Sequence, residues 1–155
     1  MDIFEQMVCD YLCGNGQAFV CTQFDCPWDA ETETGGSAPD FVVLDPWCNG
    51  DDAGDIIIVE VTTAYTITGL LEKIRNRRSR WYLPVFNMLR DRFPGYAIRT
   101  LVFIRKESVQ WAQERFCDKN DADVTFFALE DAAFPYSWHE QRSAGLPKRG
   151  AGIVL

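Results

Sequence analysis

The sequence changes its hydrophobic period abruptly near residue 65. Before that point, Ile56–Thr63 is a run of β-branched residues, which is typical of a buried β-strand. After it, one face forms at helical spacing, and this predicts a helix; the residues on that face are Ile67, Leu70, Leu71, Ile74, Arg78, Trp81 and Val85. Tyr96–Ile104 then has the pattern of another strand. A strand, a helix and a strand in this order predict a β-α-β unit.

The other segments extend this unit into a mixed α/β chain. An apolar stripe predicts an N-terminal helix that Gly14–Gly16 ends; the stripe comprises Ile3, Phe4, Met7, Val8, Tyr11 and Leu12. Further strands are expected at Ala18–Phe24, Phe41–Leu44 and Val124–Leu129, with helical stretches up to about Arg92 and over Ser108–Phe116. The order α-β-β-β-α-β-α-β predicts a central mixed sheet flanked by helices, with Phe41–Leu44 and Ile56–Thr63 as a hairpin.

Further details of this organisation can be checked directly. The long helix is expected to start from Thr66 or Thr68 as the N-cap, and Pro84 is expected to bend or break it. The last residues, 132–155, are rich in Gly, Pro and Arg, and we expect a coil-like tail there. The whole chain, residues 1–155, is expected to form a single domain.

The composition narrows the class of protein. A hydrophobic fraction of 47% over 155 residues is enough for one packed core. The longest uncharged apolar run, Ile56–Val59, is far shorter than the roughly 18 residues of a membrane span, so no membrane partner is expected. Met1–Glu5 lacks the basic residues of a secretory signal, and the six cysteines show no CxxC pair. We therefore expect a cytoplasmic protein with reduced thiols.

Charge is distributed very unevenly along the chain. Residues 1–60 contain 13 acidic residues and no Lys or Arg, whereas residues 61–155 contain 10 acidic and all 15 basic residues. Five of those bases lie in Lys73–Arg80. An asymmetry of this kind indicates acidic and basic regions with different tasks, although the formal net charge of −8 by itself argues against a polyanionic partner.

Two carboxylates stand next to apolar strands. Asp40 follows Pro39 and opens the first hairpin strand, and Glu60 ends the apolar row that Ile56 and Ile58 begin. Adjoining strands would bring the two acids together, and a hard divalent cation relieves the repulsion between close carboxylates. Mg²⁺ or Mn²⁺ suits oxygen ligands better than zinc does. The plainer alternatives are a strand-cap role for Asp40 and a water-facing edge position for Glu60.

Pro39-Asp40 and Glu60-Val61-Thr62, in the order α-β-β-β-α-β, resemble the PD-(D/E)XK nuclease superfamily over roughly residues 1–104. The resemblance implies a restriction-endonuclease-like core and Mg²⁺- or Mn²⁺-dependent hydrolysis of phosphodiesters in DNA or RNA. It implies that Asp40, Glu60 and the Val61 carbonyl hold the metal, with Glu5 of the first helix as a further ligand. The plainer interpretation of Glu5 is a helix-start acid favoured by the helix dipole.

The sequence departs from the family pattern at one catalytic position. Thr62 stands where the pattern has a lysine. Some members carry the lysine on the following helix, as in the cap-snatching endonuclease domains of segmented negative-strand RNA viruses, and the chain is similar to these because Lys73 lies 13 residues after Glu60. The resemblance then implies a catalytic role for Lys73. The alternative is an inactive or differently built site.

The basic helix is the candidate nucleic-acid-binding element. It comprises Arg75, Arg77, Arg78 and Arg80, next to Trp81 and Tyr82. Basic residues near aromatic ones suit phosphate contacts and base stacking, and the alternative is a solvated charge run that balances the acidic region. His139, the only histidine, is more typical of a surface residue than of a catalyst.

Two further classes of function remain open beside a nuclease. One is a catalytically inactive module of the same fold that binds or inhibits a basic protein, because an acidic stretch imitates nucleic acid. The other is a subunit of a homodimer or larger complex that associates through the tail or the region of Trp111.

Overall fold

The computed structural model of the chain describes residues 1–14, 18–46, 53–133 and 152–155. Within these residues, one sheet has the order β1-β2-β3-β4-β5. Its strands are β1 (Phe19–Thr22), β2 (Phe41–Asp45), β3 (Asp55–Val61), β4 (Ala97–Ile104) and β5 (Val124–Ala128). The pairs β1–β2 and β2–β3 are antiparallel, and β3–β4 and β4–β5 are parallel. The predicted α/β class and its mixed sheet are confirmed.

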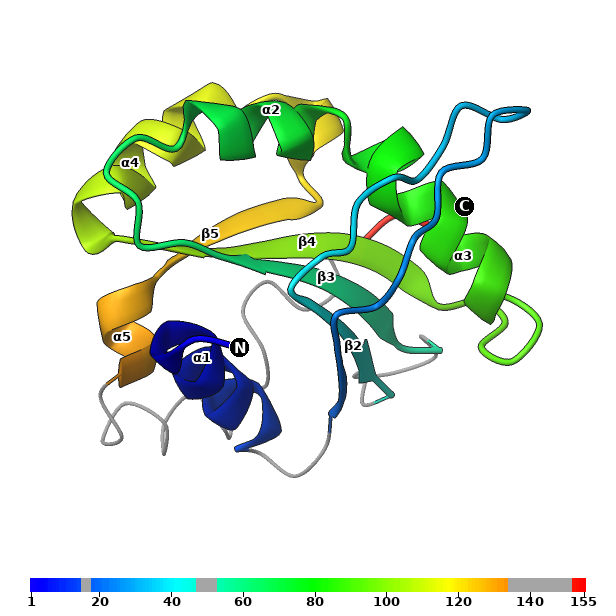
Figure 1. The fold of residues 1–155 in the computed structure, drawn as a ribbon, viewed down its shortest axis with the longest axis horizontal. Coiled ribbons are helices and arrows are strands. Elements are labelled where there is room, and N and C mark those ends of the chain that lie inside the picture. Colours follow the sequence, from blue (N-terminus) through cyan, green and yellow to red (C-terminus); the bar gives the residue numbers. More distant parts are fainter. Residues whose placement is uncertain (15–17, 47–52, 134–151) are drawn as a thin grey trace.

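Helices cover both faces of the sheet (Figure 1). On one face lie α1 (Ile3–Cys13) and α5 (Leu129–Ala133); on the other lie α2 (Thr68–Arg75), the π-helical turn η1 (Arg78–Tyr82), α3 (Leu83–Leu89) and α4 (Lys106–Arg115). A 3₁₀ turn, η2 (Lys119–Asp121), precedes β5. Among the described helices, none has the length and apolar character needed to cross a bilayer.

Strand β3 shows why helices can cover both faces of the sheet. Its residues 55–60 are all buried. Ile56 and Ile58 pack in the core below α2 and α3, whereas Ile57 and Val59 pack in the core against α1. This alternation follows the two-residue period of a strand, so Glu60 extends the row on the α2 face.

The start of β3 is held by a buried ion pair. Arg99 of β4 donates from Nε to Asp55 Oδ2 at 2.9 Å, and both side chains are at most 3% exposed. The carboxylate therefore has an opposite charge built into the neighbouring strand. Such a pair fixes the register of β3 and β4 because either partner alone would be a buried, uncompensated charge.

The helices differ from the sequence expectation in three places. The N-cap of α2 is Ile67 without a side-chain cap, and Thr68 is the first helical residue, so neither predicted threonine cap forms. Pro84 lies in the first turn of α3, where a missing N–H is tolerated, and it does not break the helix. Helix α5 was not expected, and it overlaps the start of the predicted tail at residue 132.

The remainder of the predicted tail is only partly described. Ile153 forms a β-bridge with Ile98, with backbone hydrogen bonds of 2.7 and 2.9 Å in the two directions. The end of the chain thus contacts β4. Residues 134–151, which include His139, lie outside the described residues, as does Cys48.

Candidate active site

The hairpin register brings Asp40 and Glu60 together. Phe41 pairs with Val59, so the preceding Asp40 lies opposite Glu60, where β2 begins and β3 ends. The Val61 N–H donates to Asp40 Oδ2 at 2.7 Å. Asp40 is therefore held by the backbone of the strand that carries Glu60.

Burial raises the pKa of both carboxyls, and neighbouring negative charges add to the rise. Glu60 is only 7% exposed, and burial, followed by the negative charge of Asp40, raises its pKa to about 7. Burial also raises the pKa of Asp40, the hydrogen bond from Val61 opposes that rise, and the charge of Glu5 adds to it. Within the described residues, no ion pair within 4 Å reaches either carboxylate. No described side chain therefore neutralises Asp40 or Glu60 by direct ion pairing.

The donor atoms at this edge fit a hard divalent cation. Thr62 donates its N–H to Phe103 of β4, so Val61, one residue earlier, turns its backbone toward the β2 side, where its N–H meets Asp40. The Val61 carbonyl shares that direction. Two carboxylates and one carbonyl suit Mg²⁺ or Mn²⁺, which retain several waters in protein sites. The described residues contain no cluster of three or more His, Cys, Asp or Glu side chains suited to a metal.

Glu5 is close to the pair but acts as a helix cap. Its carboxylate accepts the N–H of Asp2 at 3.0 Å, while Asp2 accepts from the first turn of α1, which completes a capping box. The N-terminal amine lies 3.8 Å from the same carboxylate. The structure thus shows the helix-start role of Glu5, and metal ligation by this residue stays a prediction.

Positive charge reaches the pair from α2 and η1. Lys73 is exposed, and its charge lowers the pKa of both Asp40 and Glu60. Arg80 lowers the pKa of Glu60 in the same way. Thr62 offers no charge, and its hydroxyl accepts the N–H of Ala64 at 3.2 Å in the turn after β3. Lys73 therefore lies on the same side of the sheet as Glu60, and a catalytic role for it stays a prediction.

The basic helix does not present all its arginines to solvent. Arg77 is buried and donates from Nε and Nη2 to Asp123 at 2.7 and 2.8 Å. It belongs to a buried network with Tyr82, and the expectation that it contacts nucleic acid is corrected on this ground. Arg75 and Arg78 are exposed, and Arg75 also lies over the Phe116 ring at 5.7 Å.

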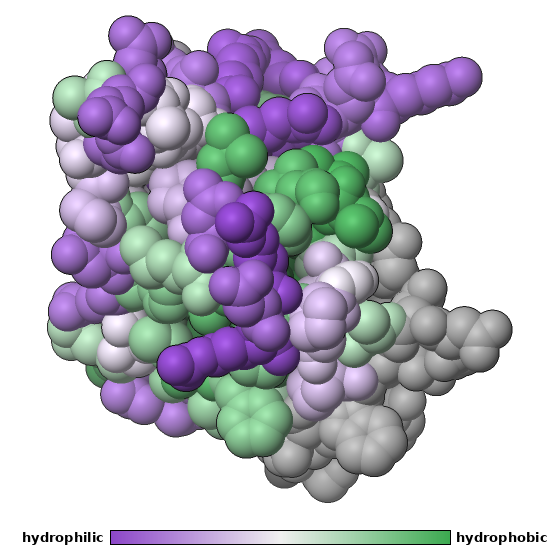
Figure 2. All heavy atoms as spheres, turned by 90° about the vertical axis from the view of Figure 1, so that its right-hand side faces the viewer, coloured by the Kyte–Doolittle hydropathy of each residue, from purple (hydrophilic) through white to green (hydrophobic). Residues whose placement is uncertain are grey.

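The loop that leads to Asp40 is anchored on η1. Gly35 donates its N–H to the Ser79 carbonyl at 2.9 Å. Gly35 has φ +86°, and a Cβ there would lie 2.2 Å from the Pro27 carbonyl oxygen, so only glycine fits. On the side of the molecule that carries this loop and α3, a band of hydrophilic residues crosses a more hydrophobic surface (Figure 2). The loop exposes four acids, Asp25, Asp29, Glu31 and Glu33.

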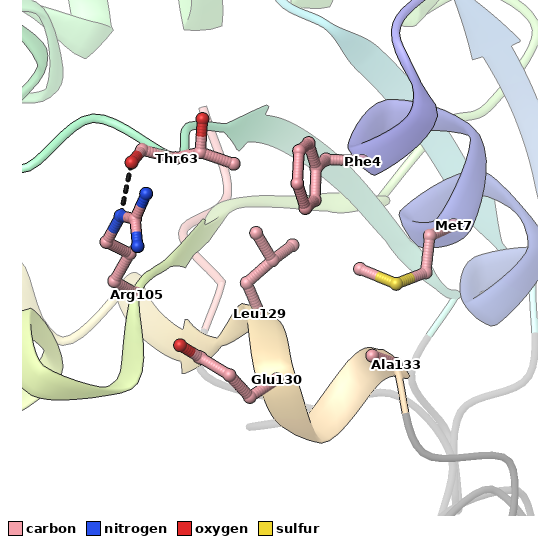
Figure 3. A pocket seen from close by; sticks show the side chains of 7 residues that line it. All are labelled: Phe4, Met7, Thr63, Arg105, Leu129, Glu130 and Ala133. Carbon is pink, nitrogen blue, oxygen red and sulfur yellow. Dashed lines mark hydrogen bonds between the residues drawn. The ribbon is translucent and has the colours of Figure 1, made fainter.

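A small cavity lies on the α1 face near the same strand ends (Figure 3). Its volume is about 160 Å³, and apolar side chains from α1 and α5 form most of its wall. Arg105, at the end of β4, lines it and donates from Nε to the Thr63 carbonyl. None of the predicted site residues lines this cavity. Sequence reasoning missed Arg105, which carries no motif.

A scan against protein-family models and searches of curated proteins and of solved structures found no match to the chain.

Proposed function

We propose that the protein is a metal-dependent nuclease that hydrolyses phosphodiester bonds in DNA or RNA. The observation that carries the proposal is the facing pair of half-buried Asp40 and buried Glu60, at the start of β2 and the end of β3, without an ion pair among the described residues. A basic helix stands beside this pair. Acidic oxygen donors next to cationic side chains are the arrangement that phosphoryl chemistry uses.

Each residue then has a defined task. Asp40, Glu60 and the Val61 carbonyl hold Mg²⁺ or Mn²⁺, which when bound lowers the pKa of water and polarises the phosphate. Lys73 stabilises the negative charge that develops on the phosphate during attack. Arg75 and Arg78, which are exposed, bind phosphates of the strand on either side of the cleaved bond.

The test is a cleavage assay with single-stranded and duplex substrates of DNA and RNA in Mn²⁺. We expect wild-type protein to cleave at least one of them, and Asp40→Asn and Glu60→Gln to reduce cleavage at least 100-fold. Glu72→Gln is the matched control, because Glu72 is an exposed acid next to Lys73 on α2, and it should retain activity. Equal rates for wild type and both site variants would contradict the proposal.

We place this activity in the cytoplasm. Cys9, Cys13, Cys21, Cys26 and Cys117, the cysteines within the described residues, are all free thiols. Free thiols in this number are in keeping with a reducing compartment.

A second candidate function rests on the acidic loop. Its exposed acids and the threonine at position 62 favour an inactive module of the same fold that binds a basic protein as a nucleic-acid mimic. This candidate requires binding that is independent of metal, and capture of a basic protein in EDTA with no cleavage in Mn²⁺ would support it over the nuclease.

A further inference from the structure

A second cavity lies on the α2 face of the sheet, between the β3–α2 loop and the first turns of α4. Its volume is about 350 Å³. Two aromatic side chains line it, Tyr65 from the loop and Trp111 from α4, together with the Glu107 carboxylate and three hydroxyl side chains. We call this cavity the aromatic cleft.

Both rings of the aromatic cleft are exposed, and each is backed by an arginine. Tyr65 is 75% exposed and Trp111 is 39% exposed. The Arg105 guanidinium lies 4.1 Å from the Tyr65 ring centre, and the Arg115 guanidinium lies 3.6 Å from that of Trp111. Neither arginine lines the cleft, so both rings border it without the guanidinium groups that stack on them.

Arg105 is itself fixed in place. It donates to the Thr63 carbonyl, two residues before Tyr65, as Figure 3 shows. The guanidinium therefore ties the loop to the end of β4 and orders the Tyr65 ring that it stacks against. A pre-ordered ring loses little conformational freedom when a planar ligand stacks on it.

The aromatic cleft lies close to the candidate active site along the chain. The loop that carries Tyr65 joins β3, which holds Glu60, to α2, which holds Lys73. Tyr65 is the fifth residue after Glu60, so their Cα atoms lie at most about 18 Å apart. A stacked nucleic-acid strand covers that distance in about five nucleotides at roughly 3.4 Å each.

We infer that the aromatic cleft holds an unstacked base of the strand that the candidate site cleaves, which makes single-stranded nucleic acid the substrate; this inference rests on the proposed function. Bases stack on aromatic side chains in single-strand-binding proteins, and cationic groups beside the rings attract the backbone. In a duplex both faces of a base are already covered. Glu107 accepts a hydrogen bond from an exocyclic amino group, as acidic residues do with cytosine.

The experiment measures binding without cleavage. Fluorescence anisotropy in EDTA compares a labelled mixed-sequence 12-nucleotide strand, as DNA and as RNA, with the matching duplex. We expect the wild-type protein to bind a single strand at least tenfold more tightly than the duplex. Tyr65→Ala and Trp111→Ala should each weaken single-strand binding about tenfold, and Tyr65→Phe, which keeps the ring, should restore it.

Trp28→Ala is the matched control, because Trp28 is an exposed tryptophan, 60% accessible, on the β1–β2 loop outside the aromatic cleft. It should bind as wild type does. Equal affinity for strand and duplex, unchanged binding by both alanine variants, or a self-association of the wild type that Tyr65→Ala abolishes would overturn the inference. Cleavage that depends on Asp40 but not on Tyr65 would overturn it and leave the nuclease proposal standing. Tyr65-dependent binding without Asp40-dependent cleavage would overturn the nuclease proposal and leave the aromatic cleft as a single-strand-binding site.

Discussion

Strand β3 carries a buried acid near each of its ends, and the two ends are treated differently. Asp55 at the start is paired with Arg99 at 2.9 Å, with both side chains at most 3% exposed. Glu60 near the end faces a second acid, Asp40, and its nearest positive charges act from a distance. The fold gives Asp55 a positively charged partner. Among the described residues, it gives Asp40 and Glu60 no such partner within ion-pair distance.

Asp123, directly before β5, resembles Asp55 in being a buried acid with a positively charged partner. Arg77 donates two hydrogen bonds to it and Tyr82 donates a third. Burial acts to raise the pKa of Asp123, and the hydrogen bonds from Arg77 and Tyr82 outweigh it, so that its pKa is lowered. The pKa of Glu60 is raised. Asp123, which has a positively charged partner, and Glu60, which has none within ion-pair distance among the described residues, therefore change the stability of the fold with pH in opposite directions.

The largest effect on the unfolding free energy is expected where a buried ion pair is broken. Arg77→Met leaves Asp123 buried without its partner, and removal of one member of a buried pair costs about 3–5 kcal/mol. Urea denaturation at pH 7 measures the loss of unfolding free energy. Arg75→Met changes an exposed arginine two residues earlier, at the end of α2; it is the control and should change the unfolding free energy by less than about 0.5 kcal/mol. Equal effects of the two variants would show that the pairing of Arg77 is not structural.

The uncompensated pair predicts a loss of stability as the pH rises. The folded Glu60 keeps its proton up to about pH 7, whereas the unfolded residue ionises near pH 4.5, so the folded state binds more protons between these values. Wild-type protein in EDTA should therefore lose about 3 kcal/mol of unfolding free energy from pH 4.5 to pH 7 through this residue.

Glu60→Gln removes this titration and should flatten that part of the stability profile. Denaturation curves collected at intervals between pH 4.5 and pH 8 provide the measurement. Asp123 contributes in the opposite sense, because its stabilisation is present above its ordinary pKa and disappears on the acid side. A variant profile with the same slope as the wild type would mean that Glu60 is not the group that titrates.

A smaller effect is expected from Lys73. Its charge lowers the pKa of Glu60 from an exposed position, so solvent screens the interaction. Lys73→Met should shift the midpoint of the pH-dependent loss upward and change the stability at pH 8 by less than about 1 kcal/mol. The same denaturation series measures both quantities. An unchanged midpoint would show that Lys73 does not act on the pair, and a downward shift would contradict the sign of the expected effect.

The smallest effect on stability is expected at Arg78. This residue is exposed and follows the buried Arg77, so Arg78→Ala should leave the unfolding free energy within about 0.5 kcal/mol of wild type. Binding of a single strand should nonetheless weaken and depend less steeply on salt, because one phosphate contact is lost. Anisotropy at two salt concentrations measures this difference, and an unchanged salt dependence would exclude Arg78 from the strand-binding surface.

The sequence predicted the elements whose period is strong. The run of β-branched residues fixed β3 within two residues, and the alternation along it placed Glu60 on the row of Ile56 and Ile58. The convergence of Asp40 with Glu60 followed from a hairpin whose register the pleat and the buried rows determine.

Other features depend on distant contacts that local pattern does not contain. The helical spacing placed Arg78 on the apolar face, whereas the structure exposes Arg78 and buries Arg77, whose partner Asp123 is 46 residues away. The π-helical turn at Arg78–Tyr82 shifts the helical face within one turn, which a constant period of 3.6 does not describe. Glu5 has a capping signature with Asp2, and that local signal explains its observed contact better than the resemblance does.

The central claim is that Asp40 and Glu60 together bind a divalent cation, and titration calorimetry with Mn²⁺ at pH 8 tests it most directly. We expect wild-type protein to bind one equivalent of Mn²⁺, Glu72→Gln to bind it equally well, and Asp40→Asn and Glu60→Gln to lose the binding heat. A wild-type protein that gives no heat, or site variants that bind Mn²⁺ as the wild type does, would contradict the account.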